Sequence, residues 1–395
     1  MDALAPIYVK VLLHLRLPNP GPPVMRATSI LKLLCATAAI VLCATPHVGA
    51  AEKKTLGFAV TKWNTAVYEG KFMDECPEGL NPSNKDIWWS KLNWEQRRKT
   101  PDILATQRSP WNFRGEHGED VCVAPTSVKD PPLRIVKGGV SFGMNLDGNT
   151  DGAATAKTCK HENFTGVDGT AGVDNQMYRL FGCVYAWRSN GHIEQNANSH
   201  RLSSGLGMIL IEISDVDDMR NDDHVDVTFY RGLDPFATDS AGHVLPFSSY
   251  RIDMENGKPR YGDKVAGKIV DGAIVTETGN VHLPFFGNYQ YMNQEIRDLR
   301  LKLSIAPDGK TAKGDVGGYY SVEQIYRYVS GMLGAFPNTT QFSCPGIYVA
   351  AHELADGYPD AKTGECTMLS SAFKLEAVAA FINHPEAKPS QQAAR

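Results

Sequence analysis

Apolar and polar residues alternate along several stretches of this chain, most clearly from residue 299 to residue 305. Every second residue there is Leu or Ile, and the residues between them are Arg, Lys and Ser. A period of two is expected for a β-strand that buries one face. Because the predicted strands are short and separated by glycine turns, we expect a mainly β fold, an antiparallel β-sandwich or jelly roll, over residues 131–384. The other predicted strands are 55–63, 207–213, 225–229, 264–276 and 373–381.

Two segments show a helical spacing of apolar residues instead. Residues 172–188 place several apolar side chains on one helical face, and Asp174 near the start suits the positive end of a helix dipole. Residues 321–333 begin with Ser321, and Gln324 follows at the spacing of a capping box. We therefore expect one or two short helices beside the strands.

The N-terminal segment, residues 51–130, contains five of the six tryptophans and several prolines. Proline interrupts regular structure, so we expect this segment to be irregular apart from the strand at 55–63. The last residues, 385–395, are small and polar, and we expect them to form a disordered tail.

The first fifty residues have the pattern of a secretory signal peptide. Arg26 and Lys32 precede an apolar run of about a dozen residues, and residues 48–50 are the small-residue sequence Val-Gly-Ala. The apolar run is shorter than the roughly 20 residues that a membrane-spanning helix needs, and we expect no transmembrane segment elsewhere. We expect residues 1–50 to be removed, with a true translation start at Met25, and the protein to be periplasmic or secreted.

Export changes how the cysteines are interpreted. Six cysteines follow the predicted cleavage point, and an even number in an oxidising compartment favours disulfides without fixing their connectivity. The alternative is a zinc site, but the sequence contains no C-x-x-C pair. The simplest pairing joins neighbours in sequence, which gives Cys76–Cys122, Cys159–Cys183 and Cys344–Cys366.

Composition and charge exclude some classes of protein. A hydrophobic content of 42% and a charged content of 21% are ordinary for a globular chain, which argues against wholesale disorder. The net charge of −4 argues against a protein that binds nucleic acid through a basic surface. We therefore expect no nucleic-acid partner.

Two acidic stretches that contain glycine have the composition of calcium-binding loops. The first reads Asp-Gly-Asn-Thr-Asp-Gly from residue 147, and the second reads Asp-Gly-Thr-Ala-Gly-Val-Asp-Asn from residue 168. Oxygen ligands at alternate positions and a glycine that permits a tight turn suit Ca²⁺. The alternative is a pair of ordinary surface turns. The expected calcium ligands are Asp147, Asn149, Asp151, Asp168 and Asp174.

The first of these stretches resembles the opening of an EF-hand loop, although Thr158 stands at the twelfth position, where a Glu is needed. Over a dozen residues it is also similar to the acidic calcium loops of thrombospondin type 3 repeats. These resemblances imply Ca²⁺ as the cofactor and cover too little of the chain to imply a family. A second acidic cluster, at 215–226, is interpreted as a solvated hairpin loop, with calcium coordination as the alternative.

Three tryptophans of the N-terminal segment are candidates for ligand contacts. Flat indole rings can stack on sugars or other ligands, and the alternative is that they form the small core of this segment. The candidate ligand-binding residues are Trp88, Trp89 and Trp94.

Common catalytic motifs are missing or incomplete. The stretch from His352 to Asp356 starts like the zinc motif H-E-x-x-H, but Asp356 replaces the second histidine and the stretch is expected to lie in a loop. His161 has no partner that the sequence identifies. The sequence contains no G-x-S-x-G motif, no P-loop and no dinucleotide-binding glycine motif after a predicted strand.

These observations predict a non-enzymatic binding or surface protein, secreted or periplasmic, with disulfides and calcium-stabilised loops. The expected ligand is a carbohydrate or another exported protein. The alternative is an extracellular hydrolase that acts on polysaccharide or polyester on a jelly-roll scaffold. Paired buried carboxylates in a cleft would favour the hydrolase, whereas loop carboxylates that converge on one point would favour metal-supported binding.

Overall fold

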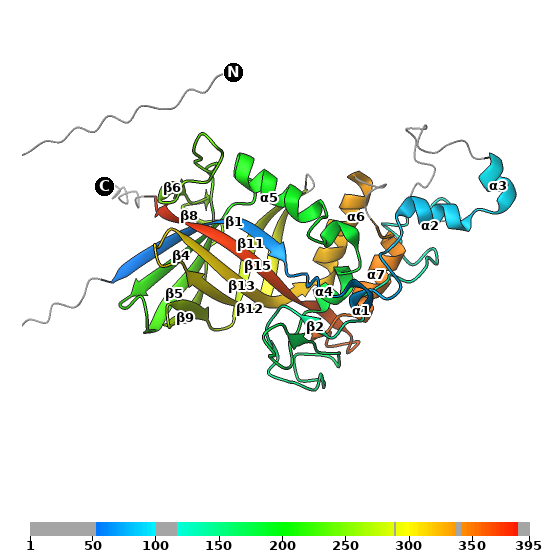
Figure 1. Ribbon diagram of the computed structural model, residues 1–395, viewed down its shortest axis with the longest axis horizontal. Helices are drawn as coiled ribbons and strands as arrows, with labels where there is room; N and C mark the ends of the chain where they lie inside the picture. Colours follow the sequence, from blue (N-terminus) through cyan, green and yellow to red (C-terminus); the bar gives the residue numbers. More distant parts are fainter. Residues whose placement is uncertain (1–52, 100–116, 288–289, 336–340, 386–395) are drawn as a thin grey trace, which may run out of the picture. The chain divides into compact units, whose positions relative to one another are not determined.

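The computed structural model describes residues 53–99, 117–287, 290–335 and 341–385 (Figure 1). The predicted signal peptide and nearly all of the predicted tail lie outside these ranges. The fold is mainly β, as the alternation predicts, and one large sheet contains most of the strands.

The large sheet contains eleven strands, all antiparallel to their neighbours except β6, which runs parallel to β15. Two pairs of very short strands lie outside it, β2 (Val140–Ser141) with β3 (Thr165–Gly166) and β7 (Met254–Glu255) with β8 (Lys258–Pro259). The strands of the large sheet are β1 (Lys54–Thr65), β4 (Ile209–Val216), β5 (Asp222–Arg231), β6 (Ser248–Arg251), β9 (Asp263–Val270), β10 (Ala273–Thr276), β11 (Gly279–Gly287), β12 (Gln290–Ile305), β13 (Thr311–Ser321), β14 (Gly357–Pro359) and β15 (Cys366–Asn383).

The large sheet closes on itself through β1. On one side β1 pairs with β4, where Phe58 lies opposite Ile211, and on the other side it pairs with β15, where Phe58 lies opposite Ala379. The hydrogen-bonded path from β4 through β5, β9, β10, β12 and β13 returns to β15. The large antiparallel sheet is consistent with the predicted sandwich-like fold, but the closure is a long-range property that the alternation pattern does not predict.

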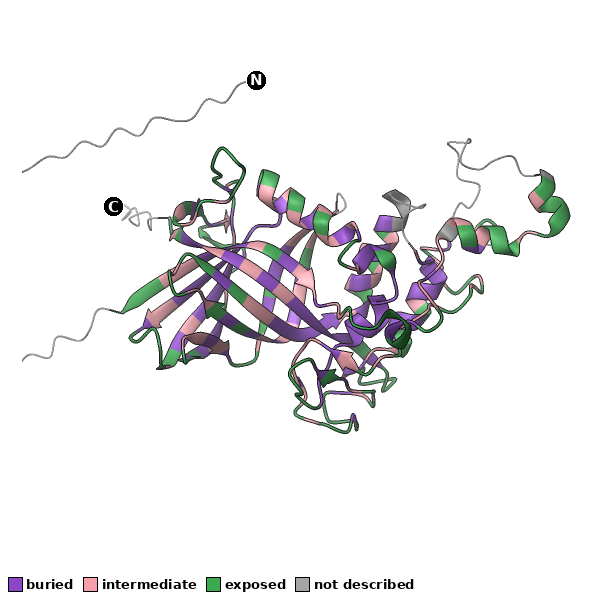
Figure 2. Ribbon diagram, in the orientation of Figure 1, coloured by how far each residue is buried: buried purple, intermediate pink, exposed green. Residues whose placement is uncertain are grey.

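Closure divides the side chains of each strand between an inner and an outer face. Phe58 and Val60 on β1 and Ile211 on β4 are buried in the main apolar core. Ala59 and Leu210, which occupy the alternate positions, belong to a second apolar cluster. Figure 2 shows buried residues along most of the length of the long strands. Both faces of β1 and β4 are therefore covered, which explains the nearly continuous apolar run at 207–213.

Helices occupy the connections between strands. The helix α4 packs against β15 and α7, α6 packs against β13, β15 and α7, and α5 packs against β1 and β11 (Figure 1). The helical elements are α1 (Phe72–Glu75), α2 (Asn84–Lys91), α3 (Trp94–Lys99), α4 (Gln176–Phe181), the short 3₁₀ helix η1 (Tyr185–Trp187), α5 (Ile193–Ser204), α6 (Val322–Ala335) and α7 (Cys344–Glu353).

The two helices predicted from spacing have different outcomes. The helix predicted at 321–333 is confirmed as α6, and the Ser321 hydroxyl accepts a hydrogen bond from the Gln324 N–H group at 3.4 Å. The helix predicted at 172–188 is wrong in extent, because only α4 and η1 are helical there. Val173 forms a β-bridge with Phe164, and Asp174 forms one with Met144. Because their backbones are extended, the helix begins only after Asn175.

The N-terminal segment contributes more regular structure than its composition predicts. The strand predicted at 55–63 is confirmed as β1, which is a full member of the closed sheet. The short helices α2 and α3 were not expected. The start of α2 is fixed by a capping box in which Ser83 and Asp86 bond each other's backbone N–H groups.

All six predicted cysteines form disulfides, but each predicted neighbour pair is wrong. The observed bonds join residues 107, 222 and 207 positions apart in sequence. The folded chain brings these distant segments together, and no property of cysteine spacing records that. The disulfides are Cys76–Cys183, Cys122–Cys344 and Cys159–Cys366.

Within the described ranges, we find no helix with the length and apolar character needed to cross a membrane. Together with the three disulfides, this fits an extracellular, disulfide-bonded protein.

Candidate metal centre

The first predicted calcium loop is a series of Asx turns. The Oδ1 atom of Asp147 accepts a hydrogen bond from the Asn149 N–H group, Oδ1 of Asn149 from Asp151, and Oδ1 of Asp151 from Ala153. Each short polar side chain thus satisfies the backbone two residues further on. Gly152 ends the series with a positive φ of 67°.

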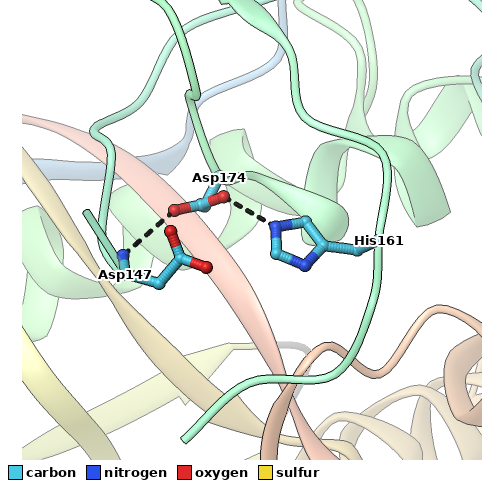
Figure 3. A group of neighbouring side chains, drawn as sticks. All are labelled: Asp147, His161 and Asp174. Carbon is cyan, nitrogen blue, oxygen red and sulfur yellow. Dashed lines mark hydrogen bonds and ion pairs between the residues drawn. The ribbon is translucent and has the colours of Figure 1, made fainter. Parts of the chain in front are cut away.

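The side chains of Asp147, His161 and Asp174 meet next to this series of turns. One ligand atom from each of Asp147, His161 and Asp174 lies within 4.8 Å of the others (Figure 3). The Nε2 atom of His161 is 2.9 Å from Oδ1 of Asp174, and the two side chains are 4% and 0% exposed. The other carboxylate oxygen of Asp174 accepts backbone hydrogen bonds from Leu146 at 2.7 Å and from Asp147 at 3.3 Å.

The orientation of the His161 ring is fixed by the backbone. Its Nδ1 atom lies 2.8 Å from the Cys159 carbonyl oxygen, which can only accept, so Nδ1 carries a hydrogen and Nε2 faces Asp174. Burial alone would lower the pKa of His161, but the hydrogen bonds to Asp174 and Cys159 outweigh it and raise the pKa to about 9. In the protein without a bound cation, His161 and Asp174 are therefore a buried ion pair at neutral pH.

Two further buried polar groups lie beside this pair. Asp356 is completely buried; its Oδ1 atom accepts a hydrogen bond from the Ser370 N–H group at 2.7 Å, whereas Oδ2 has no hydrogen-bond partner. Burial raises the pKa of Asp356 to about 7, against the opposing effects of Ser370 and the His161 charge. The Tyr319 hydroxyl is also buried without a partner, and its ring lies against Gly357, next to Asp356.

Three carboxyl groups and one histidine gather in this region. Burial raises the pKa of Tyr319, and the nearby charges of Asp356, Asp174 and Asp147 raise it further. These three carboxyl groups therefore all lie near the Tyr319 hydroxyl, and His161 is the cationic member of the group. Burial of charge is costly unless it is compensated. The cluster can therefore accept a cation.

The backbone positions of the cluster are fixed by covalent and hydrogen bonds. The Cys159–Cys366 disulfide joins the segment that carries His161 to the first residue of β15. The Cys159 N–H group also donates to the Asp356 carbonyl oxygen at 2.8 Å. His161, Asp174 and Asp356 are therefore held together by the fold, although they are far apart in sequence.

The structure brings together two of the five predicted calcium ligands. Asp147 and Asp174 are in the cluster, whereas the side chains of Asn149 and Asp151 serve the turns described above. Asp168 is exposed, and its hydrogen bond from the Thr170 N–H group lowers its pKa.

Sequence reasoning missed the other members of the cluster. The sequence did not identify a partner for His161, because Asp174 is 13 positions away and meets it only through the fold of the loop region. In the sequence, Asp356 stands out only because it replaces the second histidine of the zinc motif H-E-x-x-H. The expectation that this motif lies in a loop is wrong for His352, which is exposed on α7 with its Nε2 atom 3.9 Å from Glu323.

The second acidic cluster forms the hairpin between β4 and β5. Asp222 accepts hydrogen bonds from the Asp217 and Asp218 N–H groups, as in a solvated turn. Asp226 and His224 lie near Asp215, but Asp226 is already paired with Lys264 at 2.7 Å. These contacts agree with the hairpin interpretation.

The three candidate tryptophans lie on the N-terminal helices. Trp88 and Trp89 are on α2, with ring centroids 6.1 Å apart, and Trp94 begins α3. Trp94 is 78% exposed, which excludes it from a core.

Comparison with known proteins adds no identification, because no family model, no curated protein and no solved structure matches the chain.

Proposed function

We propose that this protein is an exported, disulfide-bonded binding protein that holds a divalent cation between Asp147, His161 and Asp174. The observation that carries the proposal is the meeting of these three donor atoms within 4.8 Å. The unpartnered Oδ2 atom of Asp356 and hydroxyl of Tyr319 support it, since buried polar atoms normally have partners.

The donor set favours a transition metal such as Zn²⁺ or Mn²⁺ over Ca²⁺. Calcium takes six to eight oxygen ligands as a rule, whereas imidazole and carboxylates together suit zinc and its neighbours. The Nδ1 atom of His161 donates to a carbonyl, as in many metal-bound histidines, and a bound cation would replace the proton that Nε2 shares with Asp174 and release it to solvent. Calcium, which the acidic loop composition predicts, is the alternative.

The role of such a cation would be to hold the loop region on the sheet. Asp147 belongs to the turn at 147–152, His161 to the disulfide-linked segment and Asp174 to the residues before α4. A shared cation would join all three. Trp89 and Trp94, exposed on the N-terminal helices, are then the residues available to contact a carbohydrate or another exported protein.

The alternative function, a hydrolase, receives less support. A His–Asp pair can act as a general base, but the catalytic nitrogen must reach the substrate. The His161 side chain is only 4% exposed and its Nε2 atom faces Asp174.

The experiment is thermal unfolding of the whole protein after chelation and after addition of Zn²⁺, Mn²⁺, Ca²⁺ or Mg²⁺, with calorimetric titration of each ion. A cation at 100 times its dissociation constant stabilises the fold by about 2.7 kcal/mol. We expect Zn²⁺ or Mn²⁺ to raise the melting temperature most. If no ion changes it and none binds, the cation proposal is wrong.

A matched pair of variants locates the ion. Asp147→Asn removes one ligand charge and keeps an oxygen for the turn, and Asp151→Asn makes the same change two turns along the same loop. We expect Asp147→Asn to weaken binding at least tenfold and Asp151→Asn to leave it unchanged. Equal effects of the two variants would place the ion elsewhere.

A further inference from the structure

A second feature of the molecule, separate from the loop cluster, is an apolar cavity of ≈ 70 Å³ between the closed sheet and its helices. Its walls come from β1, β11, β12, β13 and β15 and from α4, η1, α5 and α6. Seven of the lining side chains are aromatic, and they are Trp63, Phe181, Trp187, Phe285, Tyr320, Tyr328 and Phe373.

The aromatic rings pack in pairs around this cavity. Phe181 and Trp187 are stacked, with centroids 4.0 Å apart and planes 12° apart. The centroids of Trp63 and Phe373 are 5.5 Å apart. Phe285 and Tyr328 are nearly perpendicular at 5.0 Å. The cavity is thus bordered by aromatic rings that pack against one another.

Glu194 is the one acidic or basic residue among the described residues that line the cavity. It lies in the first turn of α5, and its Oε1 atom accepts a hydrogen bond from the Thr65 N–H group at 2.7 Å. Desolvation raises the pKa of Glu194 to about 8. The carboxyl group is therefore held in a desolvated environment, and the charge of the buried Arg201 opposes this increase only in part.

One basic group, Arg201, acts on Glu194, although no ion pair joins the two side chains within the described residues. Arg201, about two turns further along α5, is buried and attracts Glu194 electrostatically. Its guanidinium group instead donates to Oδ1 of Asn198 at 2.6 Å and to the Gly207 carbonyl oxygen at 3.2 Å. Arg201 lines neither the cavity nor the cleft beside it.

The cavity adjoins an open cleft of ≈ 760 Å³. Thr65, Trp187 and Glu194 line both spaces, so a molecule whose head occupies the cavity can extend past Glu194 into the cleft. The cleft wall is more polar and includes Tyr68 and Lys374. One ligand can therefore have an apolar head and a polar remainder.

We propose that the cavity binds the head group of a small organic cation, an alkylammonium, whose methyl groups contact the aromatic rings and whose charge is met by Glu194. Cations are attracted to the faces of aromatic rings, and cages of aromatic rings are a recurring site for quaternary ammonium groups. A volume of ≈ 70 Å³ exceeds what a single water molecule needs and leaves room for a small methylated head group.

Other ligand classes fit these residues less well. An anion would be repelled by an ionised Glu194, and a neutral hydrocarbon carries no charge for that carboxylate to attract. A bound ammonium group would favour the ionised carboxylate and so lower its pKa. This site and the proposed cation centre involve different residues, so either proposal can fail without the other.

The test compares two probes of the same shape on the wild-type protein, choline and its neutral carbon isostere 3,3-dimethylbutan-1-ol. Calorimetry measures binding, and the fluorescence of Trp63 and Trp187 reports occupancy of the cavity. We expect choline to bind at least tenfold more tightly than the isostere. Equal or tighter binding of the isostere would overturn the proposal. So would the absence of choline binding at a concentration ten times a dissociation constant of about 1 mM.

Glu194→Gln is the informative variant because it keeps the shape and removes the charge. We expect it to reduce the choline preference at least tenfold while it retains the isostere affinity. The control is Glu323→Gln, the same change on α6 at a side chain that is 72% exposed. If Glu194→Gln keeps the full preference for choline, Glu194 is not the counter-charge; retained isostere affinity shows that the variant is folded.

Discussion

Gly152 and His161 are in direct backbone contact: the His161 N–H group donates to the Gly152 carbonyl oxygen at 3.0 Å, and a Cβ atom at position 152 would lie 2.0 Å from the His161 carbonyl oxygen. Since φ of Gly152 is 67°, both backbone conformation and space require glycine. This contact brings the turn that carries Asp147 against the segment that carries His161.

Gly152→Ala should therefore lower the free energy of unfolding by more than the ~1 kcal/mol that a left-handed position alone costs. Gly148→Ala is the matched control, because Gly148 also has positive φ but has open space around its Cβ position. Urea unfolding of both variants measures the difference. Equal losses of stability would mean that the contact at Gly152 yields without cost.

The disulfide connectivity is a second prediction. Proteolysis without reduction, followed by mass spectrometry, should recover cross-linked peptides that contain Cys76 with Cys183, Cys122 with Cys344 and Cys159 with Cys366. Peptides that join sequence neighbours would contradict the structure.

Removal of the Cys159–Cys366 bond by a double serine variant should cost about 2–5 kcal/mol, since it releases a long loop in the unfolded chain. It should also weaken cation binding, because Cys159 orients His161. The control is the double serine variant of Cys122 and Cys344, which should lose comparable stability and keep cation affinity. The measurements are urea unfolding and calorimetric titration.

Stability of the chelated protein should decrease as pH rises. The pKa of His161 is raised from 6.5 to about 9 in the fold, so its contribution is complete below pH 6.5 and is lost as pH rises through about 9. The pKa of Asp356 is raised from 3.8 to about 7, so the fold favours its neutral form, and stability falls as that group ionises between these values.

The measurement is the free energy of unfolding from pH 4 to pH 10 for the wild type, His161→Asn and Asp356→Asn. We expect His161→Asn to remove the decrease above pH 6.5 and Asp356→Asn to remove the decrease below pH 7. A wild-type profile that both variants reproduce would show that neither group is coupled to folding.

Export is tested by N-terminal sequencing of the protein recovered from the periplasm or the medium. If residues 48–50 form the cleavage motif, the chain should begin at or next to Ala51. Recovery of the chain with residues 1–50 attached would contradict the signal-peptide prediction.

Local patterns in the sequence determined the type of several regular elements. The alternation at 299–305 identified part of β12, and the Ser321 and Gln324 pair identified the start of α6, because strand and helix periodicities are properties of neighbouring residues. The even number of cysteines after residue 50 indicated disulfides, because that inference needs only the cysteine count and the compartment and not the fold. The acidic loop composition pointed to Asp147 and Asp174.

Only the tertiary structure decided which distant residues meet. The pairing of β1 with both β4 and β15, the cysteine partners, and the approach of His161, Asp174 and Asp356 all depend on contacts between segments far apart in sequence. Nothing in the sequence distinguishes Glu194 from a surface glutamate, and only the packing of α5 against β1 places it beside the aromatic cavity. Burial and charge compensation arise from these long-range contacts, so no local pattern of residues records them.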